Sequence, residues 1–384
     1  MSGPTSESSP PDDWSADDRY DVRRFESADL DGLRALDRAV WDRDRSAAWF
    51  RWKYVENPYV DHVPIFVVER DGEIVGARPF LAFRLRVGSD AVLALQPADT
   101  MVHPDHRRQG LFTRMTSRAI EFYEPRAPRL FFNFPNEAAL GGYRSLGWRA
   151  VGPRRAHYRV QNPATFVESH VDGRAGDVLG ALATPVAQQY YRVRRRRFDP
   201  ADSITVERRD GADGALLASL YERDPPPELH AHRDREFYDW YLSSPAWTYA
   251  TFVAHRHGSI VAALLARTRT TDDGIRVTQL ADVAPLHGDE NWTSAVAALV
   301  ASAVDDAADV DLIAAIASAI PSEILTTHGL SAGTDLPLRR LRGEPSTFVV
   351  RPVGVTDPDP WQLDGRPLTD RSSWRVSFCE HDTA

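Results

Sequence analysis

The segment from Val102 to Phe112 combines residue types that could hold a diphosphate. It reads Val-His-Pro-Asp-His-Arg-Arg-Gln-Gly-Leu-Phe, with a strand predicted before it and a helix predicted to begin at Leu111. Free amide N–H groups at the start of a helix point toward an anion, and the helix dipole adds positive potential there. Gly110 lets the backbone come close to a phosphate group. These residues therefore predict an anion-binding loop.

Two motifs in a fixed order connect this loop to a known superfamily. In the first motif, Arg107 and Gly110 stand three residues apart, and Phe112 follows two residues later. The second motif follows an apolar strand predicted over Leu130 to Pro135, and its residues are Asn136, Ala139, Tyr143, Gly147 and Trp148. The two motifs resemble the acyl-CoA loop, [Arg/Gln]-x-x-Gly-x-[Gly/Ala], and the Asn-x-x-Ala-x-x-x-Tyr-x-x-x-Gly-[Phe/Trp] signature of the GNAT superfamily of N-acyltransferases. Phe112 departs from the first pattern, which has Gly or Ala there.

The resemblance implies an enzyme that moves an acetyl group from acetyl-CoA to a primary amine of a small molecule, amino sugar or peptide. It implies acetyl-CoA as the cosubstrate and no metal. The residues that it places against acetyl-CoA are Val102, His103, Arg107, Arg108, Gln109, Gly110, Leu111, Phe112 and Asn136. The alternative is a non-catalytic acyl-CoA-binding or regulatory protein, which would keep the loop but catalyse no reaction. Tyr143 beside an intact loop favours the enzyme, and the non-catalytic protein stays the alternative.

Acyl transfer from a thioester to an amine needs a proton acceptor for the amine and a proton donor for the departing thiolate. In the superfamily, the tyrosine that matches Tyr143 lies near the acyl-CoA sulfur, so its phenol would be the donor; the alternative is a tyrosine that packs on the apolar face of its helix. Asp99 could accept the ammonium proton, or it could be a strand-edge carboxylate bonded to backbone amides. Pro97 suggests a bulge that would splay the sheet and admit the acyl group. His103 and His106 flank the loop, where a role on the phosphate side is expected.

Composition excludes several classes of protein. The single cysteine, Cys379, rules out an internal disulfide and a thiol-ligated metal site, and a cytoplasmic location follows most easily. The net charge of −9 argues against a general nucleic-acid binder. No apolar run approaches the length of a membrane span. Lys53 is the only lysine among 384 residues, a bias that a high-salt cytoplasm or a GC-rich genome would favour.

The length suits two domains of ordinary size. The first α/β unit is predicted as a strand, two helices, three antiparallel strands, a helix, a strand, a helix and a last strand over Val151 to Val160. The expected fold class is α/β (α+β), with tandem GNAT folds, each a mixed, mostly antiparallel sheet flanked by helices. The expected divisions are a tail at 1–19, a catalytic domain at 20–162, a linker with a helix at 163–205, a degenerate GNAT-like domain at 206–355 and an extension at 356–384.

The second half repeats the order of elements in the first. An aromatic helix over Phe237 to Tyr241 matches the one over Trp49 to Tyr54, a hairpin follows each helix, and Asp282 takes the place of Asp99. The second copy lacks the Arg-x-x-Gly sequence, and its residues 289–290, both acidic, would repel a diphosphate. We therefore expect a duplicated fold whose second copy has lost its chemistry, although two unrelated α/β segments would look similar at this level.

Some features allow two interpretations. Trp49, Trp52 and Tyr54 could line a substrate cleft or pack in the core. The arginine run at 192–197 could bind an anion or form a solvated helix face. The two-unit organisation is similar to the aminoglycoside acetyltransferases of the enhanced-intracellular-survival type, which carry a further large domain. Only about thirty residues follow the second unit here, so the C-terminal carboxylate role of those enzymes does not carry over to Ala384.

Overall fold

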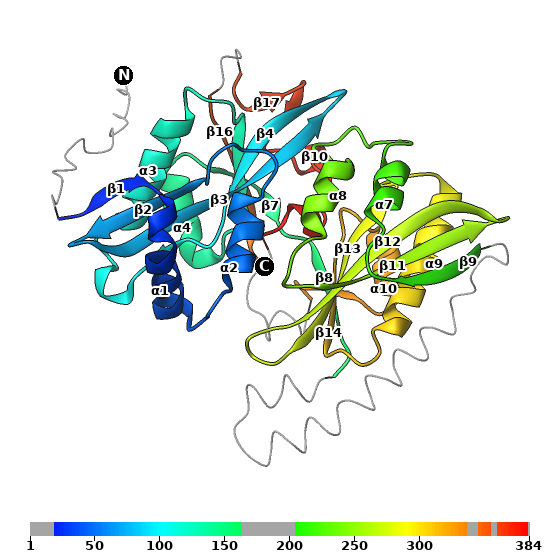
Figure 1. Cartoon of the computed structure of the whole chain (residues 1–384). Coiled ribbons are helices and arrows are strands. Elements are labelled where there is room, and N and C mark those ends of the chain that lie inside the picture. The colour runs from blue at the N-terminus through cyan, green and yellow to red at the C-terminus, as the bar shows by residue number, and fades with distance from the viewer. Residues whose placement is uncertain (1–18, 163–203, 336–344, 355–358, 383–384) are drawn as a thin grey trace, which may run out of the picture.

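The computed structural model describes residues 19–162, 204–335, 345–354 and 359–382. The predicted N-terminal tail up to residue 18 lies outside the described residues. The same holds for nearly all of the predicted linker, including its helix and the arginine run. Within the described residues, two β-sheets lie side by side, and helices cover their outer faces and occupy the space between them (Figure 1).

The first sheet takes strands from both halves of the chain. Its order is β1-β2-β3-β4-β6-β16-β7, and the short strands β5 and β10 both pair with β3. The Asp71-Gly72 turn joins β2 to β3, with positive φ at both residues, as a tight hairpin requires. The bounds are β1 (Asp21–Arg24), β2 (Ile65–Arg70), β3 (Glu73–Val87), β4 (Asp90–Pro97), β5 (Met101–Val102), β6 (Leu130–Asn133), β7 (Arg149–Pro153), β10 (His230–Ala231) and β16 (Thr347–Pro352).

The second sheet has the order β15-β8-β14-β13-β12-β11-β9. Its main hairpin turns at His257-Gly258, again with positive φ at both residues. The bounds are β8 (Ala156–Val160), β9 (Ile204–Asp210), β11 (Thr248–Arg256), β12 (Ser259–Thr270), β13 (Arg276–Ala284), β14 (Leu312–Ile316) and β15 (Ser331–Ala332). A separate two-stranded ribbon is made of β17 (Gln362–Leu363) and β18 (Arg366–Pro367).

The helices begin at residues that suit helix starts. Ser46, Asn136, Asp234 and Asp289 each accept a backbone N–H of the first turn with their side chains. The α-helix bounds are α1 (Leu30–Trp41), α2 (Ala47–Phe50), α3 (Leu111–Tyr123), α4 (Glu137–Ser145), α7 (Gly214–Tyr221), α8 (Arg235–Tyr241), α9 (Glu290–Asp306) and α10 (Ser322–Thr327). The shorter helical turns are η1 (Ser27–Asp29), η2 (Arg51–Val55), η3 (Pro104–His106), η4 (Arg371–Ser373) and η5 (Phe378–Glu380).

The two sheets exchange strands, which corrects one prediction. The segment from Val151 to Val160, predicted as one strand, is two: β7 ends at Pro153 in the first sheet, and β8 pairs with β14 in the second. In return, β16 comes from the second half and lies between β6 and β7. Proline lacks a backbone donor, so Pro153 suits a strand end better than the middle of a long strand. The boundaries 20–162 and 206–355 stay a proposal, in which β8 falls in the first range but belongs to the second sheet, and β16 falls in the second range but belongs to the first sheet.

The inner faces of both sheets share one hydrophobic core. It unites side chains of β3, β4 and β6 with those of β12, β13 and β14, together with α2, α7 and α8. The outer face of the second sheet packs against α9, and the outer face of the first packs against α3 and α4. Trp49, Trp52 and Tyr54 are buried in the shared core, which favours the packing interpretation for these residues.

The contact between the two units is itself symmetric. Trp52 donates its indole N–H to the carbonyl of Trp240 at 2.9 Å, and Trp240 donates to the carbonyl of Trp52 at 3.0 Å. The two rings stack with centroids 5.6 Å apart. In each sheet one central pair of strands is parallel, namely β4 with β6 and β13 with β14, while the other pairs are antiparallel. The expected fold class, two mixed and mostly antiparallel GNAT-like sheets flanked by helices, is confirmed.

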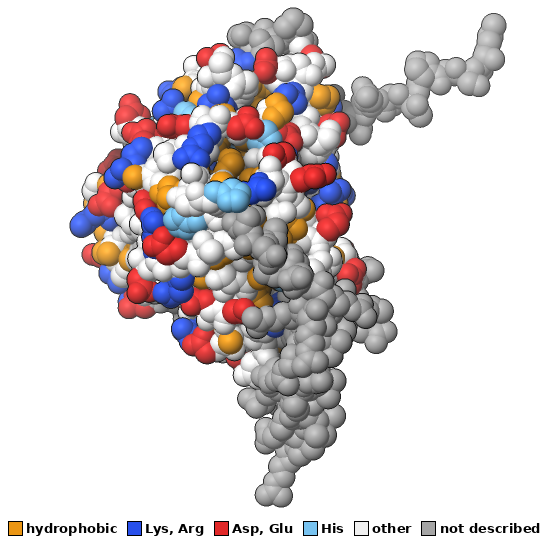
Figure 2. Space-filling view, turned by 90° about the vertical axis from the view of Figure 1, so that its right-hand side faces the viewer, with side chains coloured by type: hydrophobic (Ala, Val, Ile, Leu, Met, Phe, Trp, Pro, Cys, Tyr) orange, Lys and Arg blue, Asp and Glu red, His pale blue; other side chains and the backbone are white. Residues whose placement is uncertain are grey.

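The surface is mixed in charge. Figure 2 shows acidic and basic side chains interspersed over one face of the molecule. Of the large apolar side chains in the described part of the chain, Val55 is the exposed one, at 51%. Within the same residues, no helix is both long and apolar enough to cross a bilayer.

Candidate functional site

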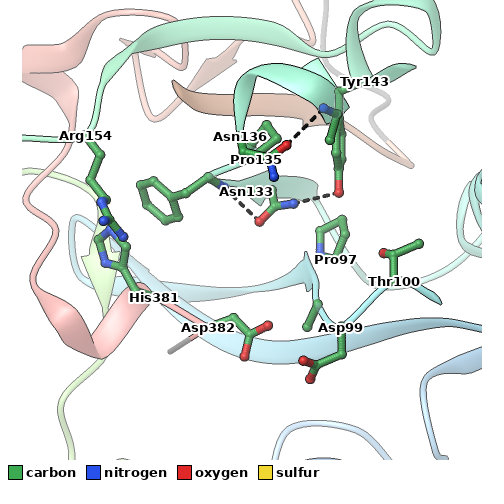
Figure 3. A pocket seen from close by; sticks show the side chains of 13 residues that line it. Pro97, Asp99, Thr100, Asn133, Pro135, Asn136, Tyr143, Arg154, His381 and Asp382 are labelled. Carbon is green, nitrogen blue, oxygen red and sulfur yellow. Dashed lines mark hydrogen bonds between the residues drawn. The ribbon is translucent and has the colours of Figure 1, made fainter. Parts of the chain in front are cut away.

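A pocket opens where two parallel strands separate. β4 and β6 are paired only at Ala94 with Leu130 and at Leu95 with Phe131. Beyond Leu95, β4 ends at Pro97 and the backbone turns at Asp99, whose φ of 39° lies in the left-handed region. The backbone segments that follow β4 and β6 enclose a pocket of about 250 Å³. The residues around it, shown in Figure 3, are Pro97, Ala98, Asp99, Thr100, Asn133, Phe134, Pro135, Asn136, Ala139, Tyr143, Arg154, His381 and Asp382.

Tyr143 presents a phenol whose oxygen already accepts two hydrogen bonds. Asn133 Nδ2 donates to Tyr143 Oη at 2.6 Å, and Arg78 Nη1 donates to the same oxygen at 3.1 Å. Arg78 is fully buried, and its Nη1 also donates to Thr100 Oγ1 at 2.6 Å. Because Oη is an acceptor in both bonds, its own proton remains available to a group in the pocket.

The predicted anion-binding loop leads into the first turn of α3. His103 N–H bonds the carbonyl of Val75 at 2.9 Å, which anchors the loop to β3. Arg108 and Gly110 have φ of 61° and 71°, so the chain turns sharply before the helix begins. Leu111 is buried, whereas the side chains of residues 107–109 are exposed. The loop thus holds charged side chains and the free amides of a long helix at the surface.

Phe112 occupies the sixth position of the loop motif, where Gly or Ala is usual, and the structure shows how it fits. Its ring lies edge-on to Tyr143 with centroids 5.5 Å apart, and the Arg78 guanidinium lies 4.8 Å from its centre. The facing residue on α4 is Gly142, where an added Cβ would come within 2.8 Å of Phe112 Cε1. A glycine on α4 therefore makes room for the large residue on α3. Phe112 in turn connects the loop to the pocket.

A cluster of buried charges forms the other side of the pocket. Lys53 Nζ donates to Asp99 Oδ2 at 2.6 Å, Tyr54 Oη donates to the same oxygen at 2.6 Å, and Arg45 Nη1 lies 2.8 Å from Asp99 Oδ1. Lys53 also contacts Asp382 Oδ1. In Figure 3 the Tyr143 hydroxyl lies on one side of the pocket and the two carboxylates lie on the other.

The two carboxylates of this cluster differ in their affinity for protons. Burial of Asp99 opposes its ionisation, but the charges of Lys53 and Arg45 outweigh burial and hold the pKa of Asp99 well below its usual range. Burial raises the pKa of Asp382, and the charge of Asp99 raises it further, against the opposing charge of Lys53. Asp99 is therefore a weak proton acceptor, and Asp382 is a stronger one.

His381 completes the wall contributed by the C-terminal segment. Its ring stacks on Phe134 with centroids 3.9 Å apart, and its Nδ1 lies 2.6 Å from the carbonyl oxygen of Ser377. This geometry assigns the proton to Nδ1, because a carbonyl only accepts. Burial, aided by the charge of Arg154, puts the pKa of His381 well below its usual range, so the ring is neutral.

The structure brings some predicted site residues together and separates others. Tyr143, Asp99 and Asn136 line the one pocket, and Asn136 also caps α4 by accepting Ala139 N–H at 3.0 Å. The partners that the structure gives Asp99 are side chains, not the backbone amides of the alternative interpretation. The predicted cosubstrate residues that lie outside the pocket form the adjoining loop and are Val102, His103, Arg107, Arg108, Gln109, Gly110, Leu111 and Phe112.

The sequence did not identify four residues of the site. Arg78 interrupts the apolar run from Ile74 to Phe83, and Lys53 is the only lysine in the chain, so each carried a signal of unusual placement. Asn133 and Asp382 carried none. Among the described residues, no three His, Cys, Asp or Glu side chains are grouped so as to hold a metal ion.

Comparison with known proteins gives a family and a fold. Residues 21–151 match the family described as the acetyltransferase (GNAT) domain. N-myristoyltransferase of Saccharomyces cerevisiae, solved with bound myristoyl-CoA, is similar at a TM-score of 0.57 and 13% identity, covering 92% of this chain and 84% of that chain. A probable N-acyltransferase from Enterococcus faecalis V583 has a TM-score of 0.54 at 10% identity, covering 87% of this chain and 72% of that chain. Eis1 from Mycobacterium abscessus has a TM-score of 0.46 at 18% identity, covering 87% of this chain and 73% of that chain. No curated protein matches the sequence.

Proposed function

We propose, from the premise that residues 21–151 are a GNAT acetyltransferase domain, that this acyltransferase moves an acetyl group from acetyl-CoA to a primary amine. The acceptor class is a small molecule, an amino sugar or a peptide. One observation supports the proposal above all others: a buried phenol and two partly buried carboxylates line one pocket, which adjoins the predicted anion-binding helix start. Those are the groups that an acyl transfer between a thioester and an amine requires.

The residues present suit an acyl-CoA. The exposed loop offers Arg107, Arg108 and the first amides of α3 to a diphosphate, and Gly110 lets the phosphate approach the backbone. The separation of β4 from β6 leaves strand edges whose free backbone groups can pair with the two amides of a pantetheine arm. Such an arm would run from the loop past Phe112 toward Tyr143.

The second unit is proposed to bind no acyl-CoA. The helix that corresponds to α3 is α9, and its first amides are already bonded to the carboxylate of Asp289, which accepts the N–H groups of Asn291 and Trp292. A carboxylate at that place accepts hydrogen bonds from the first N–H groups of the helix, and its charge repels a diphosphate.

The chemical step needs two proton transfers on opposite sides of the pocket. The amine nitrogen attacks the thioester carbon, the C–N bond forms and the C–S bond breaks. Tyr143 gives its proton to the departing sulfur, and the nearby Arg78 guanidinium and Asn133 amide stabilise the oxygen that remains. On the opposite side of the pocket, where Asp99 and Asp382 lie, a carboxylate takes a proton from the incoming ammonium group.

The proposal is tested by a screen of amines with acetyl-CoA, in which release of free thiol is measured. Amino sugars, polyamines and peptides with a free N-terminus cover the proposed acceptor classes. We expect thiol release that depends on the amine and on the enzyme. Tight acetyl-CoA binding without thiol release for any amine would favour the alternative function, a non-catalytic acyl-CoA-binding or regulatory protein.

A further inference from the structure

We propose that Asp382, on the C-terminal segment between the two units, is the residue that accepts the proton of the amine, and that Asp99 instead anchors the fold. This inference rests on the proposed N-acetyl transfer and names the base for it. The segment that carries Asp382 follows η5, which lies between the two sheets (Figure 1). Asp382 and Tyr143 line the same pocket from different parts of the chain.

The second unit shows what Asp99 does. Arg45 and Arg233 each come just before the capping residue of an aromatic helix, and each forms an ion pair with the equivalent aspartate: Arg45 with Asp99 at 2.8 Å, Arg233 with Asp282 at 2.7 Å. In both units a tyrosine hydroxyl also bonds the aspartate, from Tyr238 to Asp282 at 2.8 Å in the second.

The predicted anion-binding loop lies in the first unit, and the corresponding helix start in the second carries Asp289, so acyl transfer does not explain the second copy of this arrangement. The shared role of the two aspartates is to hold the start of an aromatic helix, against the turn after β4 in the first unit and against β13 in the second. Asp99 moreover already holds three donors, because an ammonium, a phenol and a guanidinium all contact its two oxygens.

The C-terminal segment contacts the aspartate cluster of each unit, but its two carboxylates lie in different surroundings. Glu380 contacts Arg233 and accepts the backbone N–H groups of Ala231 and Ser377, so it is enclosed on the side of the second unit. Asp382 contacts Lys53 through Oδ1 and lies on the pocket. Among the described residues, no donor bonds its Oδ2.

The charges around Asp382 suit a group that gains and loses a proton. The groups that face it from the packed elements are Lys53, Arg45, Asp99 and Tyr54, and Arg154 and His381 line the same pocket. Burial and the neighbouring Asp99 raise the pKa of Asp382, while Lys53 keeps its carboxylate in place. His381 is the rival base, but its ring binds a proton too weakly.

The protons balance over one turnover. Asp382 takes one of the three ammonium protons and later releases it to solvent, leaving a neutral amine to attack. The nitrogen of the adduct loses a second proton, which replaces the one that Tyr143 gives to the CoA sulfur. The third proton stays on the amide product.

The test compares two amines of similar shape. Benzylamine is an ammonium ion at pH 7 and needs a base, whereas phenylhydrazine is already neutral. In Asp382→Asn, kcat/KM for benzylamine should fall by about 10²–10⁴-fold, while kcat/KM for phenylhydrazine, corrected for the uncatalysed reaction, should stay within a few-fold of the parent protein. Equal losses for both amines, or no loss for either, would overturn the assignment.

Glu380→Gln is the matched control, because Glu380 is an ion-paired carboxylate in the same segment, is more deeply buried than Asp382 and does not line the pocket. It should lower the melting temperature without changing the ratio of the two kcat/KM values. Asp99→Asn removes a charge that raises the pKa of Asp382, so it should lower kcat/KM for benzylamine far less than Asp382→Asn does. A loss confined to benzylamine in Asp99→Asn that equals the loss in Asp382→Asn would overturn the inference in favour of Asp99. A parent protein that binds acetyl-CoA but releases no thiol with these two amines or with any amine of the screen would overturn the proposed function and the base with it.

Discussion

At the scale of single residues, Tyr143 occupies a position where its packing and its hydroxyl can be tested separately. The ring packs against Phe112 and Trp148, and the hydroxyl bonds Arg78 and Asn133. A purely structural tyrosine would need the ring alone. The two donors to Oη are what distinguish it, since they hold the oxygen and leave its proton to the pocket.

Tyr143→Phe should therefore lower kcat while KM for acetyl-CoA changes little. General acid catalysis contributes about 10²–10⁴-fold, so the loss in kcat should lie in that range when chemistry limits turnover. Steady-state kinetics with an amine from the screen gives both constants. A rise in KM with kcat preserved would point to a role in binding, and unchanged kinetics would return Tyr143 to a packing role.

Asp99 leads to a prediction about stability and pH. Its pKa in the folded protein lies below the unfolded value of about 3.9, so its ionised form stabilises the fold above that pH. This contribution should decline by about 1.4 kcal/mol for each pH unit below about 4. The difference in free energy of unfolding between the parent protein and Asp99→Asn should be large at pH 7 and shrink at pH 3. Urea titrations at both pH values measure it, and a difference independent of pH would contradict the assigned ion pairs.

At the scale of elements, the motifs predicted the local structures they encode. The loop residues that end in Gly110, the helix from Leu111 and the Asn136 cap all form as expected, because caps, turns and helix periodicity depend on neighbouring residues. At Pro97, where a bulge was predicted, β4 ends, and its pairing with β3 is regular up to that residue.

Long-range pairing could not be predicted in the same way. Nothing near β7 and β8 specifies that a strand some 190 residues away would lie beside β7, because strand partners are chosen by packing of whole sheets. The contact of Asp382 with Lys53 spans 329 residues for the same reason, so the sequence named Asp99 and missed Asp382. Arg78 was missed because its partners, Thr100 and Tyr143, lie on other elements.

The helix starts of α3 and α9 predict one acetyl-CoA per chain. Gly110→Asp would place a carboxylate at a helix start that now attracts anions, at a position whose φ of 71° suits glycine, so acetyl-CoA affinity should fall several-fold or more. Calorimetric titration measures both quantities. A stoichiometry of two would show that the second unit also binds, and unchanged affinity in a folded Gly110→Asp protein would show that the loop is not the site.

At the scale of the whole molecule, the strand exchange makes each unit depend on the other. The first sheet is incomplete without β16, and the second lacks a strand next to β14 without β8. The shared core adds to this dependence, because the inner face of each sheet is covered by helices of both units. The pocket has the same property, since the C-terminal segment that closes it also binds the second unit through Glu380. The second unit is therefore needed to complete the first sheet and its pocket.

This dependence predicts a single cooperative unfolding transition. Tryptophan fluorescence and far-ultraviolet circular dichroism should give the same midpoint in urea, because neither sheet can lose its exchanged strand and keep its strands continuously paired. A fragment of residues 19–162 would lack β16 and expose unpaired edges of β6 and β7 in the middle of its sheet, so it should aggregate or remain unfolded. Adding residues 345–354 to its C-terminus through a flexible linker restores the missing strand and is the matched control. Two separate transitions in the full chain, or a fragment that folds cooperatively without β16, would contradict the interlocked arrangement.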